Sequence, residues 1–93
     1  MVKLMGNLQI KVNPGAEGQR PHFEVAFIPY SGRLNTTPAR ANNHEELVAL
    51  LTELKLSEDE ASKWAGRARA QGVVLIPSFE RTETLLREQG LLA

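Results

Sequence analysis

A short turn between two predicted helices constrains this fold more than any other feature of the sequence. Leu54-Lys55-Leu56 closes one helical pattern, and Ser57-Glu58-Asp59-Glu60 begins the next. The Ser57 hydroxyl can accept a hydrogen bond from the backbone N–H three residues on, while the Glu60 side chain reaches back to the start of the helix. The sequence therefore predicts two consecutive helices with almost no loop between them.

This pair of helices looks like a helix-turn-helix, but its charges disfavour DNA reading. The second helix begins with three acids, Glu58–Glu60, at the position that would face base edges and phosphate. Its bases come later, at Lys63, Arg67 and Arg69. Acids at the start and bases at the end are what the helix macrodipole favours in any helix, so these charges need no DNA to explain them.

Two strands precede the helices. Apolar residues alternate with polar ones from Leu4 to Val12, which predicts a strand with one buried face. After the turn-rich stretch 13–21, a second strand places Phe23, Val25 and Phe27 on its inner face. We expect these two strands to pair as an antiparallel hairpin.

The other elements follow from caps and apolar runs. Asn43 and Glu46 form a capping pair for the first helix, and the second helix extends to about Gln71. The continuous apolar run 73–76 predicts a central strand that pairs parallel with one strand of the hairpin. Ser78 is expected to cap a last helix, which Gly90 closes.

These elements predict a single α+β domain over residues 1–93. We expect a two-layer sandwich in which a three-stranded mixed sheet carries three helices on one face, in the order β-β-α-α-β-α.

Composition narrows the function. The chain has 11 basic and 11 acidic side chains, so it lacks the excess positive charge of a dedicated nucleic-acid binder. With no Cys and two His, it has neither disulfides nor the usual ligands of a zinc site. Residues 1–44 carry five bases and two acids, for +3, and residues 45–93 carry six bases and nine acids, for −3. We expect no cofactor and no metal, and no signal peptide or membrane-spanning run is present, which indicates a cytoplasmic protein without a membrane partner.

The loop 31–44 is the candidate site for anions. It contains no acid and leads into a helix start, where backbone N–H groups favour negative charge. The candidate residues are Arg33, Arg40, Asn43 and His44. The alternative is that Asn43 and the following Glu residues already satisfy the helix end, while the Arg side chains are simply solvated.

The outer face of the hairpin is the candidate interface. Met5, Ile28 and Tyr30 fall on this face, and Met and Tyr are enriched at the cores of protein interfaces. One aromatic side chain is few for a platform that stacks single-stranded nucleic acid. Self-association is therefore the preferred use of the face.

Three functions are carried forward. The first is a non-catalytic binding or interaction module that homodimerises or binds another protein. The alternative is recognition of nucleic acid or of a phosphorylated ligand through the 31–44 loop. The third, less favoured, is a small enzyme that uses His44 or His22 beside a carboxylate.

Overall fold

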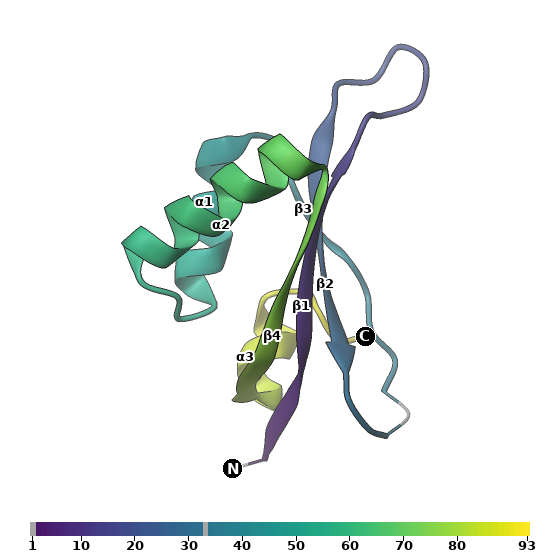
Figure 1. Ribbon diagram of the computed structural model, residues 1–93. Coiled ribbons are helices and arrows are strands. Elements are labelled where there is room, and N and C mark those ends of the chain that lie inside the picture. The colour runs from purple at the N-terminus through teal and green to yellow at the C-terminus, as the bar shows by residue number, and fades with distance from the viewer. Residues whose placement is uncertain (1, 33) are drawn as a thin grey trace.

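The computed structural model describes residues 2–32 and 34–93 (Figure 1). The elements follow one another as β1 (Lys3–Asn13), β2 (His22–Pro29), β3 (Ala39–Ala41), α1 (His44–Glu53), α2 (Glu58–Gln71), β4 (Val73–Thr82) and α3 (Glu83–Glu88). The predicted α+β class is confirmed. Its element order gains one strand, β3, because residues 39–41 of the predicted loop pair with β2.

The sheet is antiparallel throughout, with strand order β3-β2-β1-β4. The prediction of a three-stranded mixed sheet with the 73–76 strand in its middle was therefore wrong, because that strand, β4, lies at the edge. The reason lies in the helices. Because α1 and α2 run back and forth, the chain returns to the end of the sheet where β3 finished, and β4 must run opposite to β1. One crossover helix would have produced the parallel pairing that we expected.

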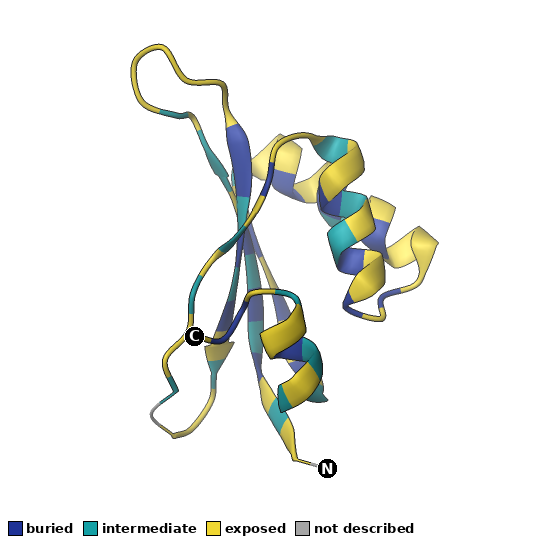
Figure 2. Ribbon diagram, turned by 180° about the vertical axis from the view of Figure 1, so that it is seen from behind, coloured by how far each residue is buried: buried dark blue, intermediate teal, exposed yellow. Residues whose placement is uncertain are grey.

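The core lies between the sheet and the helices, which cover the same face of the sheet (Figure 1). The alternation predicted for the hairpin is confirmed, with Leu8 and Ile10 of β1 and Phe23, Val25 and Phe27 of β2 buried. Helix α1 contributes Leu47 and Leu51, and α2 contributes Ala61, Ala65 and Ala68. Figure 2 shows buried residues on the helix surfaces that face the sheet and exposed residues on the opposite surfaces.

Helices α1 and α2 both begin at the predicted caps. The Asn43 side chain accepts from the backbone N–H of Glu46, and the Ser57 side chain accepts from that of Glu60. Lys55 adopts a left-handed conformation with φ 71°. Its N–H donates to the Thr52 carbonyl at 2.9 Å, and the Leu56 N–H donates to the Leu51 carbonyl at 3.1 Å. These two hydrogen bonds close α1 as a Schellman motif.

Strand β4 does not stop at Pro77 as predicted. The register shifts between Gly6 and Leu8 of β1, so that Pro77 and Ser78 together face Asn7 in a β-bulge. Ser78 has φ 52° and caps no helix. The strand continues to Thr82, whose hydroxyl caps α3 by accepting from the Leu85 N–H at 3.2 Å. Gly90 does close the last helix, with φ 79°.

The C-terminal residues hold part of the 31–44 segment. Thr36 forms an isolated bridge with Leu92, and the Thr37 N–H donates to the Leu91 carbonyl at 3.1 Å. Leu91 and Leu92 are buried in the core. Residues 35–37 of the predicted loop are therefore paired with the chain end, and residues 39–41 form β3.

Candidate functional site

The face of the sheet away from the helices is the first candidate surface, and we call it the open face. Its side chains come from alternate positions of the strands: Met5, Asn7, Gln9 and Lys11 of β1, Glu24, Ala26 and Ile28 of β2, Arg40 of β3, and Val73 and Leu75 of β4. Tyr30 extends over it from the end of β2. Its large apolar side chains are unusually exposed: Met5 45%, Ile28 42%, Tyr30 52%, Val73 48% and Leu75 47%.

The predicted interface residues Met5, Ile28 and Tyr30 thus lie on one surface. Sequence reasoning missed Val73 and Leu75, because the continuous apolar run 73–76 was interpreted as a central strand. In the sheet, Leu75 lies opposite Gln9 and Val73 lies opposite Lys11. Their alternation with the buried Val74 and Ile76 is that of a strand with one open face.

Tyr30 is fixed on this surface by its hydroxyl. The hydroxyl donates to the Asn7 side-chain oxygen at 2.7 Å and accepts from the Ser78 N–H at 2.8 Å. The phenol therefore bridges from the end of β2, across β1, to the bulge of β4. The polar group of Tyr30 is satisfied within the chain, which leaves the ring as the part available to a partner.

Strand β4 also presents a free backbone edge. The Val12 N–H donates to the Gly72 carbonyl at 2.7 Å, and the Tyr30 N–H donates to the Met5 carbonyl at 3.1 Å. Hydrogen-bonded pairs alternate along an antiparallel ladder, so even residues of β1 bond to β4 and odd ones bond to β2. Hence Val74 and Ile76 bond to β1, while the backbone groups of Val73 and Leu75 point away from the sheet.

Pro77 has the same outward orientation as Val73 and Leu75. It lacks an N–H, but that N–H would have pointed to the free edge, so the ladder with β1 loses nothing. This explains how β4 tolerates a proline that the sequence alone suggested as its end.

A groove of about 550 Å³ runs beside this edge. On the helix side it is lined by Trp64, Arg67 and Gln71 of α2, and on the strand side by residues 73–75 together with Gln9. The Arg67 guanidinium stacks on the Trp64 ring at 5.2 Å from the ring centroid. The spacing i, i+3, i+7 places the three helix residues on one stripe that faces the edge.

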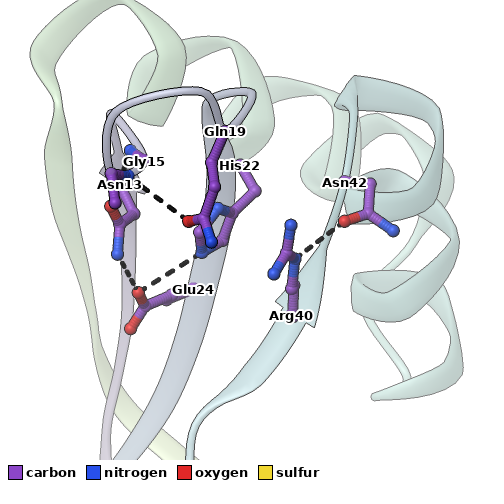
Figure 3. A network of polar contacts seen from close by, with 8 residues as sticks. Asn13, Gly15, Gln19, His22, Glu24, Arg40 and Asn42 are labelled. Atoms are coloured by element: carbon purple, nitrogen blue, oxygen red, sulfur yellow. Dashed lines mark hydrogen bonds and ion pairs between the residues drawn. The ribbon is translucent and has the colours of Figure 1, made fainter.

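A polar cluster lies at the end of the sheet near the β1–β2 loop (Figure 3). The Glu24 carboxylate accepts from the Asn13 side chain and lies 3.5 Å from the His22 Nε2. The hydrogen bond from Asn13 is the main reason that the pKa of Glu24 falls below its ordinary value; burial opposes this, while Lys11 and His22 add to it. Glu24 is thus held as a carboxylate.

The predicted anion residues fall into two neighbouring cavities. Arg40 and Asn43 line a cavity of about 400 Å³ with Gln19, Arg20, Pro21 and Asn42. Arg40 Nε donates to the Asn42 side chain at 2.8 Å. Sequence reasoning missed Arg20, since only the fold brings the β1–β2 loop next to β3. Arg33 lies outside the described residues.

The start of α1 is already occupied by a carboxylate of the chain. Asn43 Oδ1 accepts from the Glu46 N–H at 2.8 Å. The Glu46 carboxylate accepts from the side chains of Asn42 and Asn43, each at 3.3 Å. An external anion at the two Arg side chains would therefore have to bind beside this helix start rather than on it.

The two histidines line the same cavity of about 350 Å³, with Val12, Pro21, Phe23 and Arg69. No carboxylate lines it. The Nδ1 atoms of both rings are buried and lack a hydrogen-bond partner within residues 2–32 and 34–93. The carboxylate beside His22 is that of Glu24, 3.5 Å from Nε2, and Glu24 does not line this cavity.

In the described part of the chain, no three His, Cys, Asp or Glu side chains gather as a metal site. No described helix is both long and apolar enough to cross a membrane. Comparison with protein families, curated proteins and solved structures found no match to this chain.

Proposed function

We propose that this protein is a non-catalytic interaction module that binds a second copy of itself through the apolar side chains of the open face. The observation that carries the proposal is the concentration of exposed apolar side chains there. With Val2 aside, every large hydrophobic side chain exposed among the described residues, from Met5 to Leu75, belongs to this surface. Such a concentration marks an interaction site more often than a solvated surface.

The charges around this surface allow a second copy to approach. Lys11, Glu24 and Arg40 lie together at one end of the open face, and Lys3 and Glu80 lie at the other, so neither end carries charge of only one sign. With 11 bases and 11 acids, the chain has no excess charge to repel its own copy.

Light scattering after size-exclusion chromatography tests the proposal. Between about 1 µM and several hundred micromolar protein, the mass should rise toward that of two chains, as expected for a small interface. The double variant Met5→Ser with Leu75→Ser should remain a monomer, while Leu50→Ser, on the helix layer, serves as a control. A wild-type mass of one chain at every concentration would refute the proposal.

A second candidate function is recognition of nucleic acid or of a phosphorylated ligand. It is favoured by the cavity that joins Arg20 and Arg40, since no carboxylate lines it. Two guanidinium groups from separate segments can hold one phosphate between them.

Fluorescence anisotropy with short labelled DNA and RNA at low salt tests this second function. Binding should weaken at least tenfold in Arg20→Gln with Arg40→Gln. Arg87→Gln is the control, because Arg87 pairs with Glu83 at 2.9 Å on α3. Binding that the double variant leaves unchanged would rule out this cavity.

A further inference from the structure

We propose that two copies of this chain pair antiparallel along their β4 edges, about a two-fold axis at Leu75, to form one continuous eight-stranded sheet. This inference rests on the proposed function, because it specifies how the self-association takes place. It places the contact at the β4 side of the open face, where Val73 and Leu75 are exposed.

The sheet has one long free edge, and it belongs to β4. At the other side of the sheet, β3 is only three residues long, and nearby residues 35–37 bond to the chain end. Natural sheets shorten or cover their edges because an open strand recruits another strand. Here β4 keeps four residues, Val73–Ile76, before the bulge at Pro77 and Ser78 interrupts the edge.

The outward backbone groups fix the register. Val73, Leu75 and Pro77 point away from β1, so these residues must form the new ladder. With Leu75 opposite Leu75 of the second copy, Val73 lies opposite Pro77. The two Leu75 residues then exchange two hydrogen bonds, and each Val73 N–H donates to a Pro77 carbonyl, which makes four bonds without using the missing proline N–H.

A shifted register fits less well. If Val73 lay opposite Leu75 of the second copy, Pro77 would lie opposite Gln71, which is the last residue of α2 rather than a strand residue. Pairing at Leu75 also aligns Val73, Leu75 and Pro77 of both copies into one apolar row on the open face. The cross-strand contacts in such a row stabilise the pair.

The helix layer supports the same arrangement. Helix α2 packs against β4 and β1, the two strands at this edge. Joining two sheets at that edge would bring the two α2 helices side by side on the same face of the joined sheet. The stripe Trp64, Arg67 and Gln71 would then face its own copy across the groove beside the edge.

The interface would be small. Five strand residues and three helix residues from each copy amount to far fewer than the 20 to 30 residues of a standard interface. We therefore expect a dimer that dissociates at micromolar concentrations.

Cysteine cross-linking tests the register, and the native chain has no Cys to interfere. In the edge pair, the two Leu75 Cα atoms lie about 5.5 Å apart, within disulfide range. Leu75→Cys should oxidise to a covalent dimer at protein concentrations that populate the dimer. Ile28→Cys is the matched control, because Ile28 is similarly exposed on the same face but belongs to an inner strand. It should remain monomeric on a non-reducing gel.

The outcomes separate the two proposals. A light-scattering dimer that cross-links through Ile28→Cys but not through Leu75→Cys would overturn edge pairing and leave the proposed function standing as face stacking. A wild-type monomer would overturn both. If the protein is a dimer in solution but neither variant cross-links, edge pairing is also overturned.

Leu75→Pro is an independent variant. It removes an N–H that points to the free edge, so the ladder with β1 should survive while the dimer loses its two central hydrogen bonds. We expect at least a tenfold weaker dimer and an unchanged far-UV circular dichroism spectrum. If the proline perturbs the strand, Leu75→Lys provides the same test by placing a charge at the edge. Unchanged dimerisation in a folded Leu75→Lys variant would contradict the proposal.

Discussion

Tyr30 connects three strands of the sheet although its side chain is half exposed. Its hydroxyl partners lie on two other strands, at Asn7 and at the Ser78 N–H. Ser78 has φ 52°, a conformation that costs a non-glycine residue free energy. The bond from Tyr30 helps to hold the bulge in place, and the bulge in turn ends the part of the β4 edge that is open to pairing.

We predict that Tyr30→Phe lowers the free energy of unfolding by about 0.5–1.5 kcal/mol, the net contribution of a typical intramolecular hydrogen bond. Urea unfolding at low protein concentration measures this without a contribution from dimerisation. Ile28→Val, a small change on the same face, is the control and should cost less. Equal stability of Tyr30→Phe and the wild type would show that water replaces the hydroxyl.

Glu24 makes the hairpin sensitive to acid. Because the folded state lowers the pKa of Glu24, chiefly through the Asn13 hydrogen bond, its contribution is fully present above the pKa of the unfolded chain, about 4.3 for Glu. It is lost as the pH falls through the lower, folded pKa.

We therefore predict that Glu24→Gln loses less stability than the wild type between pH 6 and pH 3, measured by urea unfolding at each pH. Glu17→Gln removes an exposed carboxylate from the same hairpin and should retain the wild-type acid dependence. Parallel curves for the wild type and Glu24→Gln would contradict the prediction.

At the scale of the element, the turn between α1 and α2 contains a local compromise. Lys55 occupies the left-handed position of the Schellman motif, where glycine is usual. The turn nevertheless forms because its two backbone bonds and the Ser57 cap all favour it.

We predict that Lys55→Gly raises the free energy of unfolding by about 0.5–1 kcal/mol, since glycine adopts positive φ without the Cβ penalty. Lys55→Ala is the matched control: it removes the same charge and chain but keeps the Cβ, so it should give no gain. Thermal or urea unfolding of the three proteins measures the difference. An equal gain from Lys55→Ala would point to the charge rather than to the backbone.

Elements with local signals were predictable, and those defined by their neighbours were not. The caps at Asn43 and Ser57 and the alternation of β1 are encoded within a few residues, and the structure confirms them. The apolar run Val73–Ile76 predicted a strand but not the position of that strand in the sheet. The exposure of Val73 and Leu75 depends on their neighbours in the folded sheet, which the run itself does not specify. Strand β3 is too short to show a period.

The candidate sites show the same division. Because side chains alternate between the two faces of a strand, the sequence predicted that Met5 and Ile28 lie on one face, and the register confirms this. The approach of Arg20 to Arg40, and of His22 to His44, joins segments about 20 residues apart, and no local pattern indicates it. Tertiary contacts of this kind follow only from the assembled fold.

At the scale of the whole molecule, association should be visible in stability and in fluorescence. Binding that favours the folded state raises the apparent stability with concentration. We predict that the melting temperature of the wild type rises with protein concentration and that of Leu75→Lys does not.

The chain has one Trp, Trp64, beside the proposed contact. Its emission should shift to longer wavelength on dilution, and a spectrum independent of concentration would contradict the edge contact.

The unequal margins of the sheet decide how far assembly can grow. One margin ends in the three-residue β3, and the other is interrupted by the bulge at Pro77 and Ser78. Once two such margins have joined, neither molecule keeps an equivalent one, so growth ends at two and does not continue into a fibre. Because only one edge of the sheet is open to pairing, the same asymmetry that permits a dimer prevents further polymerisation.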